Sequence, residues 1–279
     1  MTDANTMAHK GRIAEVFEKC RERHQAALVP FIVAGDPDLD TTKRLVLEFE
    51  HRGADLIELG VPFSDPMADG PANQRALARG LNAGASLAAI LSMVSELRSE
   101  TSIPLVLFGY FNPIFHYGCA RLCADAARAG IDGLLVVDLP VEEEGELRKP
   151  ARAHGLDIIH LLAPTTPPDR AKTIARSSSG FLYYVSVTGV TGARTELASD
   201  LEHNVVNLRQ LTSLPVGVGF GISTPDQAAA VARFADAVVV GSAISTTIER
   251  NLKSHDLVRT VGEMVGALKN AMVNARAAA

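Results

Sequence analysis

Three kinds of residue are scarce in this 279-residue chain: it has no tryptophan, only three cysteines, and aromatic residues amount to 5%. The lack of tryptophan excludes nothing by itself. The few cysteines build no disulfide framework and fit a reducing compartment. Cys119 and Cys123 stand four residues apart in an expected helix, as a metal or redox pair could, but no second ligand pair lies near them. Small buried thiols are therefore the preferred interpretation.

Long apolar segments and basic clusters are missing as well. No apolar run approaches the ~20 residues of a membrane span. The first ten residues are polar and lack the apolar core of a signal peptide. Lysine and arginine are scattered, and the net charge is -5. These absences argue against a membrane or nucleic-acid partner, and we expect a cytoplasmic protein.

What the chain does contain is a repeated order of apolar and amphipathic segments. Apolar residues make up 47% of it, and several apolar runs are continuous, as in strands covered on both faces. The expected strands are 27–34, 56–61, 105–110, 133–139, 157–162, 181–187, 216–220 and 237–240. Helical patterns stand between them, among them 41–51, 85–97, 120–129, 142–153 and 228–235. Eight strand–helix units predict an α/β fold, a (β/α)8 TIM barrel, which typically has ~250 residues.

The same pattern predicts how the chain is divided. Residues 11–24 form an additional amphipathic segment before the first strand, which could be an extra N-terminal helix that closes the barrel floor. No linker rich in serine, glycine or proline interrupts the chain, so residues 1–279 are expected to form a single TIM-barrel domain. A doubly wound sheet is the rival fold, but no reversal point in the strand order is apparent.

A carboxylate inside an apolar strand is the most informative feature of the sequence. Glu58 lies within the apolar run 54–61, where an unpaired charge would be costly. Strand alternation puts Glu58 on the same side as Leu56. If that side faces the barrel interior, burial favours the neutral acid and raises the pKa of Glu58. Such a carboxyl group can donate a proton and later remove one. The alternative is a structural glutamate bonded to backbone N–H groups.

Two further acids stand in the loop after this strand. Asp65 and Asp69 lie in a segment that Pro62, Pro66 and Pro71 stiffen. Chemistry in a barrel sits at the C-terminal ends of the strands, so a second carboxylate at this place suits acid–base catalysis. Either aspartate could instead serve only the turn, since Asp before Pro or Gly is common in turns.

Glycine-bearing segments follow the last three expected strands. They are TGVTG at 188–192, GFGIS at 219–223, and Gly241 with Ser242. Glycine lets backbone N–H groups approach an anion closely, and the N-terminus of the following helix adds positive potential. Barrels often hold a phosphate between the loops after strands seven and eight. The glycines could also serve only tight turns, but three adjacent loops favour a phosphate site.

Schiff-base and metal mechanisms find little support. None of the seven lysines falls in an expected strand, where a Schiff-base aldolase needs a desolvated lysine. His116 and His160 have no carboxylate or cysteine at ligand spacing, so no metal site is expected. We interpret His160 as a satisfied interior residue and the acidic run 142–144 as the solvated first turn of a helix. The residues alone thus predict a cofactor-free barrel that binds a phosphorylated substrate and transfers protons with carboxylates.

The segment ELGVPFSDPMADGP at 58–71 resembles the signature segment of tryptophan synthase α subunits. The resemblance continues in order through 30–37, 138–140, 186–192, 219–223 and 241–244, and so covers nearly the whole chain. The long segment is highly specific, whereas the last one alone would be weak. The resemblance implies retro-aldol cleavage of indole-3-glycerol phosphate to indole and glyceraldehyde 3-phosphate, in the last steps of tryptophan biosynthesis.

Residue roles follow from the matching positions of this family. By the resemblance, Glu58 protonates indole C3 and takes the proton of the glycerol hydroxyl group. Asp69 would hold the indole N–H and stabilise the positive charge that develops on the ring. The phosphate would be bound by Gly192, Gly221, Gly241 and Ser242. The indole pocket would be lined by Phe31, Phe108, Tyr110 and Tyr183, of which Tyr183 could instead be plain barrel core.

The resemblance also implies a protein partner. This would be a β subunit that carries pyridoxal phosphate and receives indole through a channel in an α2β2 heterotetramer, while this chain itself would need no cofactor. The loop 62–71 and the segments near Asn112 and Pro140 would contribute to the contact. The loop 188–194 would close over the substrate.

One departure and two alternatives accompany the resemblance. Val33 stands where some relatives carry threonine, so a hydroxyl contact from this position to Asp69 is absent. The chain could be a free-standing indole-3-glycerol phosphate lyase that works without a partner. It could also be a non-catalytic barrel subunit that activates the partner, although the presence of both Glu58 and Asp69 argues against this.

Overall fold

Eight parallel strands close into a barrel in the computed structural model of the chain, which describes residues 11–186, 196–219 and 221–277. The strands follow chain order, and β1 completes the ring by pairing with both β2 and β8. They are β1 (Ala27–Val33), β2 (Ile57–Gly60), β3 (Leu105–Gly109), β4 (Gly133–Val136), β5 (Asp157–Leu162), β6 (Leu182–Val185), β7 (Val216–Gly219) and β8 (Ala237–Val240). The predicted TIM barrel is confirmed, and the rival doubly wound sheet is wrong.

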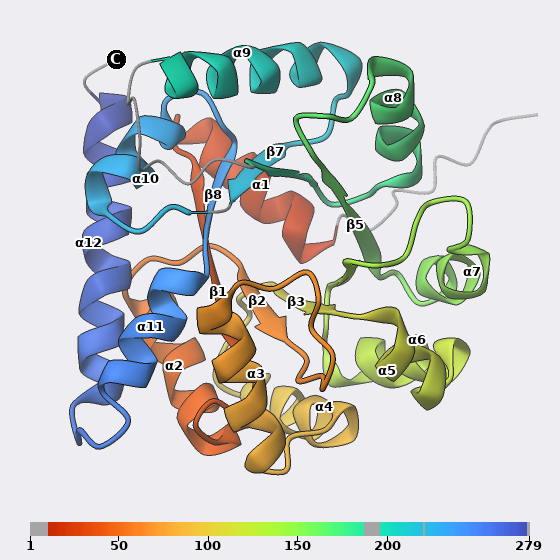
Figure 1. Cartoon of the computed structure of the whole chain (residues 1–279), viewed down its shortest axis with the longest axis vertical. Helices are drawn as coiled ribbons and strands as arrows, with labels where there is room; N and C mark the ends of the chain where they lie inside the picture. The colour runs from red at the N-terminus through yellow and green to blue at the C-terminus, as the bar shows by residue number, and fades with distance from the viewer. Residues whose placement is uncertain (1–10, 187–195, 220, 278–279) are drawn as a thin grey trace, which may run out of the picture.

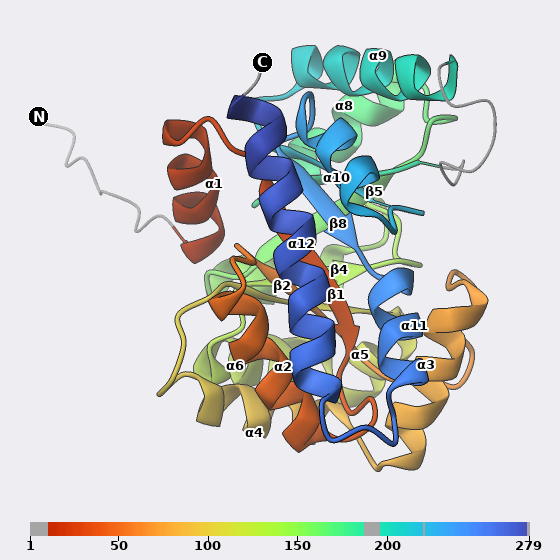
Figure 2. The same cartoon turned by 90° about the vertical axis from the view of Figure 1, so that its left-hand side faces the viewer.

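Helices surround the barrel on its outside (Figure 1). In the described residues they are α1 (Arg12–Glu22), α2 (Leu39–His51), α3 (Pro71–Asn82), α4 (Leu87–Leu97), α5 (Phe111–Tyr117), α6 (Cys119–Ala129), α7 (Gly145–Ala153), α8 (Pro168–Ser177), α9 (Glu196–Leu211), α10 (Pro225–Ala232), α11 (Ser242–Arg250) and α12 (Leu257–Ala277). The long helix α12 packs against both α10 and α2, in front of the junction between β1 and β8 (Figure 2).

The extra N-terminal helix α1 closes the floor of the barrel, as predicted. Its residues Ile13 and Phe17 are buried in the same interior cluster as Leu56, which comes just before β2. The Phe17 ring lies 5.6 Å from the ring of Phe181, measured between centroids. Because α1 and the inward side chains of the strands fill this end of the barrel interior, we look for the site at the C-terminal ends of the strands, where barrel enzymes carry it.

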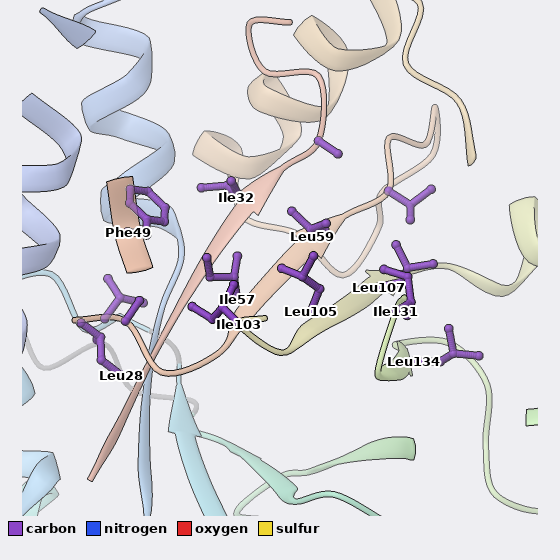
Figure 3. Packing of buried hydrophobic residues seen from close by; sticks show 14 of the residues in the cluster. Leu28, Ile32, Phe49, Ile57, Leu59, Ile103, Leu105, Leu107, Ile131 and Leu134 are labelled. Atoms are coloured by element: carbon purple, nitrogen blue, oxygen red, sulfur yellow. The ribbon is translucent and has the colours of Figure 1, made fainter. Parts of the chain in front are cut away.

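A second apolar layer joins the outer face of the strands to the helices. Ile57 and Leu59 of β2 point into this layer and pack with Leu105 of β3 and Phe49 of α2 (Figure 3). The two faces of β2 therefore differ as strand alternation predicted, with Leu56 inside the barrel and Ile57 outside it.

Side-chain caps explain where several elements begin and end. Asp38 accepts the N–H of Thr41 at 2.6 Å, so α2 begins at residue 39 and not at 41 as predicted. A capping box starts α10 at residue 225, three residues earlier than predicted. Strand β4 ends at residue 136 instead of 139 because the Asp138 carboxylate turns to accept the N–H of Phe111 at 2.7 Å. Hydrogen bonds of side chains to the backbone thus override the apolar pattern at element ends.

None of the helices in the described ranges is long and apolar enough to cross a membrane alone. Helices α3 and α4 pass that test only as a pair bent by 90°. Their apolar residues, such as Leu77 and Ile90, are buried within the protein.

Candidate active site

Glu58 projects from β2 into a cavity inside the barrel, which confirms its predicted inward orientation. The side chain is fully buried, and neither carboxylate oxygen accepts a hydrogen bond from any residue in the described part of the chain. Burial raises the pKa of Glu58 from 4.5 to about 8, so the group is mostly protonated at neutral pH. The alternative of a glutamate bonded to backbone N–H groups finds no support among the described residues.

Asp69 ends the loop between β2 and α3, and its neighbours hold its carboxylate. The Tyr110 hydroxyl group donates to Oδ2 of Asp69 at 2.6 Å and accepts the N–H of Ala68 at 3.0 Å. The Asn73 amide lies 3.4 Å from Oδ1. Burial raises the pKa of Asp69, while the bonds from Tyr110 and Asn73 oppose the rise. The hydroxyl contact that Val33 cannot make is supplied by Tyr110.

Asp65 lies apart from this site. Its side chain is exposed and accepts a hydrogen bond from Ser64 Oγ at 2.6 Å. Its backbone oxygen accepts the N–H of Met67 at 2.9 Å. Asp65 therefore stabilises the turn, which was the alternative to a catalytic role for this residue.

Glu58 and Asp69 line the same cavity, which has a volume of about 400 Å³ and lies at the C-terminal ends of the strands. Three of the four predicted aromatic residues also line it: Phe31, Phe108 and Tyr183. The rings of Phe31 and Phe108 meet edge to face, with centroids 5.0 Å apart. Tyr110 supports the site from behind through its bond to Asp69. An apolar, aromatic cavity of this size suits a flat bicyclic ring.

The glycines predicted to bind phosphate meet at another side of this cavity. Gly221, Gly241 and Ser242 line it, and Ser242 is the first residue of α11. Gly221 has φ +77°, a conformation that favours glycine. The N-terminus of α11 adds positive potential, which suits an anion. Gly192 and the loop 188–194 lie outside the described residues, as does residue 220.

The acidic run 142–144 corrects one interpretation made from the sequence. Glu144 is buried and is not part of a solvated turn, since α7 begins only at residue 145. Its Oε2 lies 2.7 Å from Nε2 of His160, and its Oε1 lies 2.9 Å from Arg148. His160 Nδ1 is 3.0 Å from Ser178 Oγ. His160 is thus the satisfied interior residue that was predicted, with a carboxylate partner that sequence spacing did not reveal.

The remaining predictions concern cysteine and lysine. Cys119 and Cys123 are buried and unbridged, as predicted, and burial raises the pKa of Cys123 to about 11. The eight strands contain no lysine, so none of them offers an amine for a Schiff base.

Asn73 is a site residue that the sequence analysis missed. It lines the cavity, close to Asp69 and within the first turn of α3. Pro71 occupies the first position of this helix, a place that proline favours. The proline would have predicted where α3 begins. Asn73, four residues after Asp69, would then be expected on the same side of the chain as Asp69.

The buried acid of this site predicts a pH effect on stability. The pKa of Glu58 is about 8 in the folded chain and 4.5 ordinarily, so the folded state holds an extra proton between these values. The contribution of Glu58 to the free energy of unfolding therefore falls as the pH rises through this window, by at most about 1.4 kcal/mol per pH unit. Urea unfolding of the parent and of Glu58→Gln at pH 5 to 9 should show the variant gaining relative stability with pH. Parallel stability curves would contradict the raised pKa.

One cavity of this TIM barrel combines a buried acid, a second carboxylate held by hydrogen bonds, an aromatic lining and a helix start lined by glycine. These features define a class, the barrel enzymes that transfer protons on a small anionic substrate. The comparisons with known proteins narrow this class. A family model, tryptophan synthase alpha chain, matches residues 17–273.

Similar proteins and solved structures agree with the family model. The tryptophan synthase alpha chain of Citrifermentans bemidjiense is 55% identical over 262 residues, which are 94% of this chain and 98% of that protein. That of Gluconacetobacter diazotrophicus is 52% identical over 271 residues, 95% of this chain and 99% of that protein. A crystal structure of tryptophan synthase subunit alpha from Legionella pneumophila has a TM-score of 0.89 and 37% identity, covering 95% and 100% of the two chains. The chain belongs to the tryptophan synthase alpha chain family, and it is a lyase of tryptophan biosynthesis.

Proposed function

We propose that this chain cleaves indole-3-glycerol phosphate into indole and glyceraldehyde 3-phosphate at the cavity around Glu58. The observation that carries the proposal is the fully buried Glu58 carboxyl group, with a pKa of about 8, in the same cavity as Asp69. Membership of the tryptophan synthase alpha chain family favours this reaction over a free-standing or a non-catalytic barrel.

In the proposed reaction Glu58 acts as both acid and base. Protonated Glu58 gives its proton to C3 of the indole ring, which leaves a positive charge on the ring nitrogen. The bond from C3 to the glycerol carbon then breaks, and its electron pair restores the aromatic ring. The Glu58 carboxylate takes the proton of the hydroxyl group on that carbon, whose oxygen becomes the aldehyde oxygen. Glu58 ends protonated, as it began, and a pKa near the working pH suits both transfers.

Asp69 stabilises the charged ring in this proposal. Its carboxylate accepts the indole N–H, whose positive charge grows when C3 is protonated. The bond from Tyr110 holds the carboxylate before the substrate arrives, so little reorganisation is needed. The aromatic lining of Phe31, Phe108 and Tyr183 excludes water from the ring and strengthens this interaction.

The phosphate is assigned to the backbone N–H groups and hydroxyl group at Gly192, Gly221, Gly241 and Ser242. Support comes from the three members of this set that line the cavity beside the start of α11. Among the residues that line the cavity, Glu58 and Asp69 are the two that carry a carboxyl group. A doubly charged phosphate group is favoured at such a helix start.

The variant Gly221→Ala tests this assignment. A methyl group at residue 221 would obstruct the anion, and we expect the affinity for glycerol phosphate to fall at least about tenfold, or about 1.4 kcal/mol. Gly84→Ala is the matched control, because Gly84 has nearly the same φ, +78° against +77°, with open space around it. Both variants should lose similar stability, but calorimetry should show weaker binding only for Gly221→Ala. If Gly221→Ala binds glycerol phosphate as tightly as Gly84→Ala does, Gly221 is not part of the phosphate site.

A pyridoxal-phosphate β subunit in an α2β2 assembly is part of the proposal, with no cofactor in this chain. Two large apolar side chains are exposed near the segments expected at the contact: Met67 is 88% exposed in the loop 62–71, and Phe115 is 58% exposed on α5 near Asn112. Exposed side chains of this kind suit burial by a partner. A cytoplasmic location and a single domain over residues 1–279 complete the proposal.

The experiment that tests the function measures indole released from indole-3-glycerol phosphate, with and without a β subunit. We expect slow release by the isolated chain and faster release by the complex. A rate that the β subunit does not change would favour a free-standing lyase. No indole from either sample would favour an activating subunit without chemistry.

A further inference from the structure

Helices α3 and α11 lie side by side in both Figure 1 and Figure 2 and carry the two ends of the proposed site. Asp69 stands just before α3, and Ser242 begins α11. Between them, Ser245 of α11 donates its hydroxyl hydrogen to Oδ1 of Asn73 at 2.9 Å. Asn73 is 172 residues away from Ser245 along the chain, so only the fold brings them together.

The direction of the Asn73 amide follows from its two neighbours. The Asp69 carboxylate only accepts hydrogen bonds, so it requires the NH2 group of the amide, and Nδ2 lies 3.4 Å from Oδ1 of Asp69. The Ser245 hydroxyl group, which is buried, then meets the carbonyl oxygen. A reversed amide would aim its oxygen at the carboxylate and repel it. Asp69 therefore sets the orientation of the Asn73 amide, and the Ser245 hydroxyl group, which can donate or accept, holds it there by donating to the carbonyl oxygen.

A second set of contacts makes the two helices one unit. Arg75 of α3 holds Glu249 of α11 through two bonds of 2.7 and 2.8 Å. Arg79 of α3 lies 3.1 Å from the same glutamate and also binds the buried Asp36 with 2.7 and 2.8 Å bonds. These ion pairs join α3 to α11 on the same side as the contact between Asn73 and Ser245.

We propose that Asn73 is a positioning residue that couples the phosphate end of the site to the Asp69 carboxylate through Ser245. A phosphate bound at Gly241 and Ser242 orders the first turn of α11, and Ser245 lies within that turn. The ordered hydroxyl group holds the Asn73 amide, and the long bond from Asn73 to Asp69 shortens, as hydrogen bonds of active sites often do when ligand binds. The inference rests on the proposed function, because it assumes that phosphate and indole bind at these two ends.

The test is the binding of indole to the full chain, with and without saturating glycerol 3-phosphate. In the parent protein we expect glycerol phosphate to tighten indole binding about fivefold, at the lower end of usual couplings between sites. In Asn73→Leu the tightening should vanish, while the affinity for glycerol phosphate alone stays unchanged. In turnover, the kcat of this variant should fall about tenfold, because Asp69 loses a bond that orients it, with a smaller change in KM.

Two further variants make the test specific. Gln74→Leu is the matched control, since exposed Gln74 donates to the backbone oxygen of Asp69, at 2.8 Å, and not to its carboxylate, and it should behave like the parent. Ser245→Ala should weaken the coupling, and the double variant with Asn73→Leu should be no worse than Asn73→Leu alone. Additive losses, or coupling that survives in Asn73→Leu, would overturn the inference.

The outcome also separates this inference from the proposed function. If Asp69→Asn inactivates the enzyme but Asn73→Leu binds and turns over as the parent does, only the coupling role of Asn73 fails. If Asp69→Asn leaves indole formation unchanged, the proposed role of Asp69 fails first, and the coupling has no target.

Discussion

Replacement of Glu58 by glutamine is expected to lower the kcat for indole formation about 10³-fold while the barrel stays folded. The amide is nearly isosteric with the acid but has no proton to give to indole C3 and no basic oxygen to receive one. General acid–base catalysis contributes about 10²–10⁴-fold for one group, and Glu58 is assigned both transfers. The measurement is steady-state indole release by the isolated chain, with circular dichroism and urea unfolding to confirm the fold.

Glu144→Gln provides the matched control. Glu144 is also a buried glutamate, but it pairs with His160 outside the cavity of Glu58 and Asp69. Its replacement should cost stability, because His160 loses its carboxylate partner, and should leave turnover within about threefold. A folded Glu58→Gln protein with activity within about tenfold of the parent would end the assignment of Glu58 as the acid and base.

That Glu58 shares a face of β2 with Leu56 was predictable, because strand geometry is local and strict. Side chains alternate along a strand with period two, so Leu56 and Glu58 had to share a face and Ile57 had to take the other. The barrel itself was predictable for a related reason, since eight repeats of a buried strand and a helix leave few ways to cover every apolar face. The resemblance to a family added the roles of Glu58 and Asp69, which periodicity alone does not distinguish from turn and core roles.

Two of the contacts that were missed join separate elements of the chain. Glu144 meets His160 because α7 begins beside β5, and Asn73 meets Ser245 because α3 lies against α11. The rotation of each helix on the barrel decides such pairs, and neither the apolar pattern nor the spacing within one segment encodes that rotation. The end of β4 was missed in the same way, because the Asp138 carboxylate accepts the N–H of Phe111, which follows the neighbouring strand β3.

Asp69→Asn is expected to lower kcat about 10²–10³-fold, the usual effect of removing one group that stabilises a developing charge. Asparagine can still accept the indole N–H through its oxygen, so the substrate should bind with little change in KM. What it lacks is the negative charge opposite the ring nitrogen when C3 is protonated. The loss should be smaller than for Glu58→Gln, because no proton transfer is removed. Single-turnover indole formation by the isolated chain checks this, since it isolates the chemical step.

Two other variants in the same region show whether the charge itself matters. Asp65→Asn removes a carboxylate from the same loop, but Asp65 is exposed and bonded to Ser64, so the isolated chain should keep its activity. Tyr110→Phe keeps the Asp69 charge but removes the 2.6 Å bond that aims it, and we expect an intermediate loss of about tenfold. We therefore expect the loss of activity to be largest for Asp69→Asn, smaller for Tyr110→Phe and smallest for Asp65→Asn. This order follows only if a fixed negative charge faces the reacting ring. Equal effects of Asp69→Asn and Asp65→Asn would mean that the loop matters through its shape, and Asp69 would lose its role in charge stabilisation.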